Sequence, residues 1–334
     1  MFEVETRFMN WTNVTNVAQI STPSRVLLII LNILIVVFGI CGNGFVLFLS
    51  KKHNALKMDK MSVIFLENLA IADIIIVFTK FIPMLLIMIL DRWVLGKVMC
   101  GLVGYFQLLP IVAEVLLTTS LTCHRIHVLK RPLHAGMMRT RTGHLFAFLV
   151  WGVSLTYLMI CMLRLPVVFH PLAFSCVSIY HSTGTDLIID TLFLYLPSRI
   201  IPMLVTVLGN IYVLYIVAKS LGRMGERELP GRHAVITTSI ISGCFIIAML
   251  PEIIVYILVL LEGPLKHLTL VQWVILSLCQ QYILALNVVI NPLFIYYWRN
   301  KTFRKAVKDI LTGKDVRDTE RWSKGGGLET DMYV

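Results

Sequence analysis

Residues 98–129 read VMCGLVGYFQLLPIVAEVLLTTSLTCHRIHVL. This stretch is mostly apolar and longer than the ~20 residues that an α-helix needs to cross the hydrocarbon core of a membrane. It nevertheless contains Gln107, Glu114 and Arg125, which are spaced 7 and 11 residues apart. Because a helix turns by about 100° per residue, both spacings return a side chain to the same face. The stretch therefore predicts a transmembrane helix with one polar stripe that runs from its outer half to its cytoplasmic end.

The composition of the whole chain agrees with a membrane protein. Of the 334 residues, 57% are hydrophobic and only 15% are charged, and the mean hydropathy is +0.80. Soluble domains are usually about 45–50% apolar and about 25% charged. So much apolar surface needs lipid as its solvent. This excludes a disordered chain and, despite the net charge of +11, a domain that binds nucleic acid.

Seven apolar runs are long enough to cross a membrane, and polar loops of modest length separate them. They cover residues 25–50, 61–89, 98–129, 144–168, 187–218, 234–261 and 268–297. The predicted fold class is therefore all-α integral membrane, a seven-transmembrane helix bundle.

Lys and Arg predict how this bundle is oriented, because basic residues collect in cytoplasmic loops. Most of the 30 basic residues lie in four segments on one side of the bundle, 51–60, 125–141, 219–232 and 299–324. This places the C-terminus in the cytoplasm and the N-terminus outside the cell.

The segment after the last span predicts a short amphipathic eighth helix on the inner membrane surface. Trp298, Phe303, Val307 and Leu311 recur near a helical period among basic residues, which favour anionic lipid head groups. The predicted domains are an extracellular tail at 1–24, a seven-transmembrane domain at 25–298, the amphipathic helix at 299–312 and a cytoplasmic tail at 313–334.

Two pairs of residues concern the extracellular side. Of the seven cysteines, Cys100 and Cys176 lie in polar stretches beside the apolar runs, which makes them the candidate disulfide on the oxidising side. Asn10 and Asn13 begin acceptor sequons in the predicted extracellular tail, where N-glycosylation is expected.

Ionisable residues inside a membrane span are costly and therefore indicate functional sites. Asp73 on the second span and Glu114 on the third lie at similar depth. Two carboxylates at one level repel, so one holds a proton or a cation such as Na⁺ lies between them. Asn287 and Asn291 complete this predicted sodium or proton site. The alternative is that the two acids face different helices and are satisfied separately by Ser, Thr or Asn.

A second group of polar residues lies toward the outer ends of the spans. The candidate ligand-binding residues are Lys80, Gln107, Arg199, Glu252, Tyr256 and Gln281. Arg199 and Glu252 have opposite charges at comparable depth, and two interpretations stay open. They form an internal salt bridge between two helices, or they bind a charged or zwitterionic ligand.

A series of short motifs, in order along the seven spans, resembles the rhodopsin-like (class A) G protein-coupled receptors. The resemblance covers about residues 25–311 and rests on Gly42-Asn43, Leu69-Ala70 with Asp73, Trp93, Cys100, Arg125, Trp151, Pro202, Phe245, Pro251 and Asn291-Pro292. It implies a plasma-membrane receptor, not an enzyme, in which an extracellular ligand shifts an equilibrium between two packings of the helices. It also implies that His124, Arg125 and Ile126 contact a heterotrimeric G protein, with arrestin as a further partner. No cofactor is expected besides a bound Na⁺.

Several positions depart from the family pattern. His124 stands where the family has an acid before its coupling Arg, Met249 replaces the sixth-helix Trp, and Ile295 replaces the seventh-helix Tyr. Because Arg125 lacks its neighbouring carboxylate and His124 can titrate near neutral pH, we expect elevated or pH-sensitive basal signalling.

Two positions bear on the ligand. Gln107 stands where receptors for amines have an Asp, and Ala285 stands where opsins have the Lys that binds retinal. A peptide or another small polar ligand is therefore expected. The rival hypothesis is a cation- or proton-coupled transporter or channel with Asp73 and Glu114 in its path. The sequence contains no inverted repeat of the transporter kind.

Overall fold

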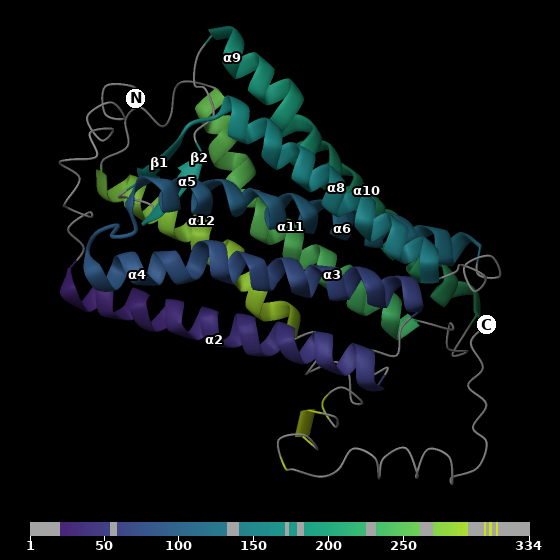
Figure 1. Ribbon diagram of the computed structural model, residues 1–334. Coiled ribbons are helices and arrows are strands. Elements are labelled where there is room, and N and C mark those ends of the chain that lie inside the picture. The colour runs from purple at the N-terminus through teal and green to yellow at the C-terminus, as the bar shows by residue number, and fades with distance from the viewer. Residues whose placement is uncertain are drawn as a thin grey trace.

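The computed structural model describes residues 21–53, 59–131, 140–170, 174–178, 184–224, 232–260 and 270–292, together with Arg304, Val307, Lys308 and Thr312. Its long helices run side by side in one bundle, with a two-stranded hairpin at one end (Figure 1). The elements are α2 (Thr22–His53), α3 (Lys60–Ile76), the π-helical η1 (Val77–Phe81), α4 (Ile82–Leu90), α5 (Gly96–Phe106), α6 (Leu108–Lys130), α8 (Thr140–Arg164), β1 (Val167–His170), β2 (Ser175–Ser178), α9 (Gly184–Ile189), the π-helical η2 (Asp190–Ile200), α10 (Ile201–Met224), α11 (Arg232–Leu260) and α12 (Leu270–Ile290).

The described residues form seven helical rods, because several elements join end to end. The second rod consists of α3, η1 and α4, the third of α5 and α6, and the fifth of α9, η2 and α10. Six rods are long and apolar enough to cross a membrane, and α12 contributes an apolar stretch at Ile275–Ile290. Each rod coincides with one predicted span, so the predicted all-α bundle is confirmed.

The fourth rod ends earlier than the sequence predicts. The predicted span runs to residue 168, whereas α8 ends at Arg164 and strand β1 begins at Val167. Pro166 explains the difference, because a proline disfavours helical backbone at the residue before it and has no N–H to continue the helix. β1 instead pairs antiparallel with β2, which places Phe169 opposite Cys176.

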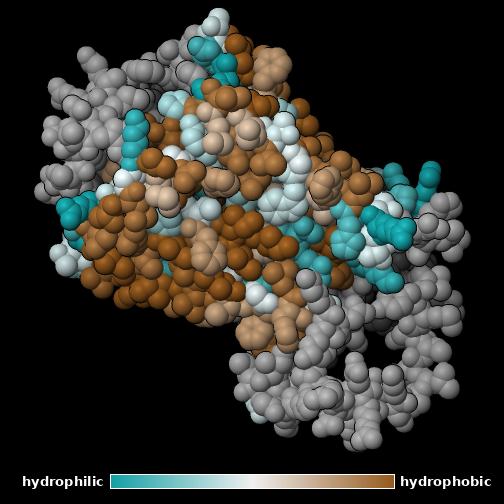
Figure 2. Space-filling view, viewed as in Figure 1, coloured by the Kyte–Doolittle hydropathy of each residue, from teal (hydrophilic) through white to brown (hydrophobic). Residues whose placement is uncertain are grey.

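The outer face of the bundle is apolar, as a lipid environment requires. Large hydrophobic side chains are widely exposed there, including Leu163 at 88% and Phe148 at 74%. Figure 2 shows such side chains as a broad apolar surface over the helices. Water penalises exposed apolar area by about 25 cal/mol per Å², whereas lipid tails are as apolar as these side chains. The chain is thus a multi-pass membrane protein.

The first and last rods meet through a glycine and a side-chain hydrogen bond. A Cβ atom on Gly42 would lie 2.7 Å from Cγ of Pro292, so a larger residue does not fit. Pro292 has no N–H and leaves the carbonyl of Val288, four residues earlier, without its helical donor. Asn43 Nδ2 donates to that carbonyl at 3.0 Å. A residue of α2 therefore completes the hydrogen bonding of α12.

Most of the predicted amphipathic helix, like both tails, lies outside the described residues. Arg304, Val307 and Lys308 are helical, and Val307 is buried in the same apolar cluster as Val46 and Leu49. This is consistent with an apolar face turned toward the bundle. The eighth helix at 299–312 and the limits of the four domains stay predictions.

Candidate functional site

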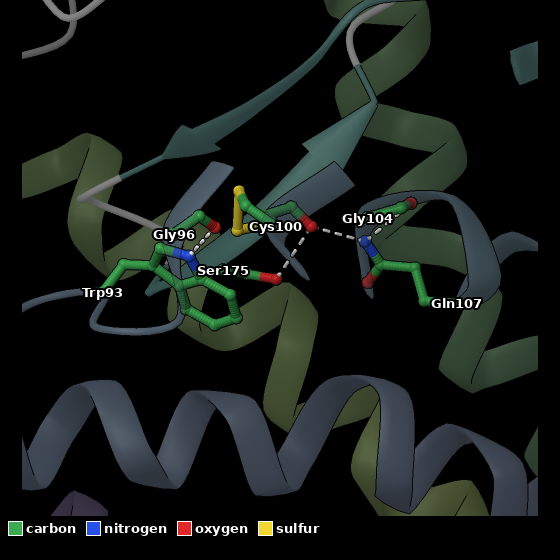
Figure 3. Close-up of a disulfide and its surroundings, with 7 residues drawn as sticks. Trp93, Gly96, Cys100, Gly104, Gln107 and Ser175 are labelled. Atoms are coloured by element: carbon green, nitrogen blue, oxygen red, sulfur yellow. Dashed lines mark hydrogen bonds between the residues drawn. A yellow bond between two sulfur atoms is a disulfide. The ribbon is translucent and has the colours of Figure 1, made fainter. Parts of the chain in front are cut away.

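A disulfide at the hairpin end of the bundle joins the third rod to β2. Cys100 of α5 and Cys176 of β2 form the predicted bond, and both are buried. Gln107, at the junction of α5 and α6, donates its amide to the carbonyl of Cys176 at 2.6 Å and to that of Gly104 at 3.2 Å (Figure 3). The amide nitrogen of Gln107, a predicted ligand-binding residue, thus holds the hairpin against the third rod.

Two glycines allow the chain to pack closely at this end. Gly96 has φ +75°, a left-handed conformation that favours glycine, and its carbonyl accepts a hydrogen bond from Trp93 Nε1 at 2.7 Å (Figure 3). A Cβ atom on Gly104 would overlap the side chain of Val167, so glycine lets β1 approach α5. The disulfide is therefore embedded in a fixed local structure.

In the middle of the bundle, Asp73 of α3 and Glu114 of α6 lie together. Their carboxyl groups are direct electrostatic neighbours, with Asn291 near Asp73 and Asn287 near Glu114. All four side chains are buried. Within the described part of the chain, their side-chain oxygens have no hydrogen-bond partner at normal distance. A buried ionised carboxylate without a partner is costly, so this arrangement needs a shared proton or a bound cation.

Three further charges adjoin this pair. Arg199 of η2 pairs with Glu252 of α11, with 3.2 Å between Nε and Oε1, and its charge also acts on Glu114. Lys80 of η1 lies within electrostatic reach of Glu252 and Glu114. The two predicted sites are therefore one group, called the charge cluster below, which contains Asp73, Lys80, Glu114, Arg199 and Glu252.

The charge cluster has three acids and two bases, so it carries one excess negative charge when all five groups are ionised. One proton or one monovalent cation neutralises that charge. The oxygens of Asp73, Glu114, Asn287 and Asn291 are donors of the kind that hard cations prefer, and the residues present therefore fit Na⁺.

Arg199 is fixed by its backbone surroundings as well as by Glu252. Arg199 Nη1 donates to the backbone carbonyl of Ser198 at 3.3 Å. The internal salt bridge considered from the sequence is therefore present. The Arg199 side chain is 3% exposed and the Glu252 side chain is 24% exposed, so Glu252 is the more accessible partner.

Tyr256 lies between the fifth and sixth rods. Its ring stacks on Tyr195 with 3.4 Å between the ring centroids, and its hydroxyl shares a hydrogen bond with Thr191 Oγ1 at 2.9 Å. Gln281, the last of the predicted ligand-binding residues, is buried on α12. The predicted ligand-binding residues thus come from five different rods.

At the other end of the third rod, the structure supplies a carboxylate that the sequence analysis missed. Asp59 precedes α3 and pairs with Arg125, Oδ2 to Nη1 at 2.9 Å, and with His124, Oδ1 to Nε2 at 2.7 Å. The carboxylate that the family pattern places beside Arg125 is absent, since His124 stands there, but Asp59 supplies a carboxylate from another part of the chain. Ile126, the third residue of the predicted coupling segment, is partly buried.

Asp59 remains ionised at this position. Burial alone would raise the pKa of the Asp59 carboxyl, but the hydrogen bond from His124 and the charge of Arg125 outweigh it and hold that pKa well below its usual range.

Some residues singled out from the sequence lie outside the described residues, namely Asn10, Asn13 and Ile295. At the position of the expected sixth-helix Trp, Met249 is buried and packs in one apolar cluster with Phe245 and Leu284. An apolar side chain therefore fills this part of the core.

Comparison with known proteins gives the same architecture. Residues 42–296 match the family described as 7 transmembrane receptor (rhodopsin family). The chain is 24% identical to galanin receptor 2b of Danio rerio over 294 residues, 87% of this chain and 76% of that receptor. It is 26% identical to a QRFP-like peptide receptor of Branchiostoma floridae over 140 residues, 41% of this chain and 36% of that receptor. The crystal structure of squid rhodopsin matches with a TM-score of 0.73 at 19% identity, over 93% of this chain and 94% of that one.

The family match begins at Gly42 within the first rod and ends beyond α12, so it covers part of the first rod and all of the other six. The fold agrees with that of squid rhodopsin over nearly the whole length of both chains. Members of this family are receptors and not enzymes. The chain therefore belongs to the rhodopsin family of seven-transmembrane receptors, the class A G protein-coupled receptors.

Proposed function

We propose that this receptor lies in the plasma membrane and transmits the binding of an extracellular peptide or small polar ligand to heterotrimeric G proteins. The observation that carries the proposal is the position of Arg125, a buried cation near one end of α6 in a chain that matches the receptor family. The disulfide-linked hairpin lies at the other end of the same rod. The third rod thus connects the two ends at which a ligand and a G protein would act.

The two ends of the bundle differ as the proposed orientation requires. The disulfide lies at the hairpin end, and disulfides form on the oxidising side of a membrane. The basic segments 51–60, 125–141 and 219–232 join rods at the opposite end. The N-terminus with Asn10 and Asn13 would then be extracellular and available for glycosylation. The cytoplasmic end would bind G protein, arrestin and anionic lipid head groups.

The charge cluster supports a ligand that carries polar or charged groups. Glu252 is 24% exposed and Lys80 is partly exposed, so an anion and a cation are accessible close together. Tyr256, on the same rod as Glu252, and Gln281, on α12, add hydrogen-bonding groups. Arg199 and Gln107 belong to the same proposed site. Arg199 positions Glu252, and Gln107 positions the hairpin. The relative named as a peptide receptor supports a peptide among such ligands.

Signalling in this scheme is a shift between two packings of the rods. Thr119 of α6 and Thr206 of α10 share a hydrogen bond at 2.9 Å, and Thr122 of α6 shares one with Ser242 of α11 at 3.3 Å. A movement of α10 and α11 away from α6 at the cytoplasmic end would strain or break these contacts. Single hydroxyl bonds of this kind contribute about 1 kcal/mol each, so ligand binding can offset them.

The rival function, a transporter or channel with Asp73 and Glu114 in its path, is not favoured. The chain belongs to a receptor family.

The test is G protein activation in transfected cells, measured without added ligand across a panel of G protein families. At matched surface levels, we expect Arg125→Ala to reduce the wild-type signal to that of mock-transfected cells, because the cation that would contact the G protein is removed. Arg92→Ala removes an exposed arginine at the hairpin end and should leave the signal unchanged. Equal signals above the mock level from wild type and Arg125→Ala would contradict the coupling role of Arg125.

A further inference from the structure

We propose that Asp59 is the residue that positions Arg125, and that signalling requires the Asp59–Arg125 pair to open. The inference rests on the coupling role proposed above for Arg125. Asp59 lies outside the predicted spans and belongs to a different rod from Arg125. It acts on signalling through Arg125 and has no direct contact with ligand.

Each oxygen of the Asp59 carboxylate makes one bond within its own rod and one to the third rod. Oδ1 accepts from the backbone N–H of Ser62 at 2.9 Å and pairs with His124 at 2.7 Å. Oδ2 accepts from the Ser62 hydroxyl at 2.8 Å and from Arg125 Nη1 at 2.9 Å. The bonds to Ser62 fix the carboxylate as the N-cap of α3. A rigidly held anion therefore contacts His124 and Arg125, two of the three residues predicted to couple to the G protein.

Arg125 depends on this anion. Its side chain is 4% exposed, and among the described residues Nε and Nη2 have no hydrogen-bond partner. A buried cation without a counter-charge is strongly unfavourable. While it is paired with Asp59, the Arg125 side chain is 4% exposed, so a contact with a partner protein requires Arg125 to leave this buried position. A G protein that binds Arg125 must therefore displace it from Asp59.

The lowered pKa of Asp59 sets the pH range in which the pair acts. A depressed carboxyl pKa means that the favourable interaction is present above the ordinary value of about 4 and is lost only when the pH falls through the lowered value. Asp59 therefore supplies its charge throughout the physiological range. The pair therefore holds wild-type basal signalling below the level expected of a receptor in which Arg125 has no carboxylate partner.

Asp59→Asn removes the charge and keeps a side chain that caps a helix as well as Asp does. We expect basal G protein activation to rise about tenfold at matched surface level, a typical size for a coupling contact. Asp59→Asn combined with Arg125→Ala should abolish the increase. Glu67→Gln is the matched control. It removes an acid from the same helix, where Glu67 accepts a hydrogen bond from Ser50, and it should leave the signal unchanged.

Rescue distinguishes a role in positioning Arg125 from a merely structural role. His124→Asp in the Asp59→Asn background places a carboxylate next to Arg125 in sequence, and it should return basal activation to near the wild-type level. If Asp59→Asn leaves basal activation unchanged in cells where the wild-type signal depends on Arg125, the proposal is overturned.

A stability measurement decides the proposal even where no G protein responds. For the purified full-length receptor in detergent, we compare melting temperatures of Asp59→Asn, Arg125→Gln and the double variant. If the residues act as a pair, the double variant melts no lower than the less stable single variant. Additive losses would overturn the proposal. A different outcome is that no variant activates any G protein while the melting temperatures of the single and double variants are non-additive. That outcome would count against the proposed coupling function and leave the positioning role of Asp59 supported.

Discussion

Replacing Cys100 with serine is expected to reduce the yield of folded receptor at 37 °C to about a tenth or less. The disulfide joins Cys100 to Cys176 across a sequence separation of 76 residues, and in the chain-entropy model closing a loop of that size stabilises the folded state by about 4.5 kcal/mol. The loss leaves β2 attached to the third rod mainly through the amide of Gln107. Fluorescence-detected size-exclusion chromatography of solubilised cells measures the monodisperse fraction.

The sequence offers a matched control for this substitution. Cys279 is an exposed free cysteine, so Cys279→Ser removes a thiol without breaking a disulfide and should give the wild-type yield. Cys176→Ser and the double variant should each resemble Cys100→Ser, because all three lose the same bond. A Cys100→Ser receptor that folds as well as the control would show that the hairpin holds its position without the disulfide.

Exchanging NaCl for choline chloride is expected to lower the melting temperature of the purified wild type by about 5 °C. A ligand at 100 times its Kd stabilises the folded state by about 2.7 kcal/mol, and 1 kcal/mol corresponds to about 2 °C, the low end of the usual range, for a chain longer than ~250 residues. The excess negative charge of the charge cluster supplies the attraction. Glu114→Ser removes that excess charge, so the melting temperature of the variant should no longer depend on the cation.

Two further results refine this prediction. Glu67→Gln, an acid-to-amide change away from the charge cluster, should keep the full dependence on sodium. A wild type that responds to pH and not to sodium would favour a shared proton between Asp73 and Glu114. If melting is indifferent to the cation, to pH and to Glu114→Ser, the sodium or proton site is wrong.

The rods were predictable because a membrane span is a property of consecutive residues. α6 ends at Lys130, one residue beyond the predicted span. The early end of α8 also has a local cause in Pro166. The hairpin was not predictable in the same way, because β1 and β2 have four residues each and are stabilised by Cys100 and Gln107, which are distant in sequence.

The candidate site shows the same limit. Helical spacing placed Glu114 and Asp73 at similar depth, but depth does not determine how far each helix is rotated about its axis. The electrostatic contact of Glu114 with Lys80 and Arg199, which joins the two predicted sites, depends on that rotation. Asp59 lies outside the seven predicted spans, where a charged residue is ordinary, so nothing in the sequence singles it out. Its partner Arg125 is 66 residues away, and only packing of the rods reveals the pair.

The hydrogen bond from Asn43 to the carbonyl of Val288 joins residues 245 positions apart. During synthesis α2 leaves the ribosome first and α12 last, and chains generally fold in that order. The first helix therefore enters the membrane before its hydrogen-bond partner in α12 has been synthesised. A chain that stops shortly before residue 288 would contain most of its helices but would lack the packing partner of Gly42 and the hydrogen-bond acceptor of Asn43. Quality control in the cell would therefore meet late truncations as unfinished bundles, even though little of the receptor is missing.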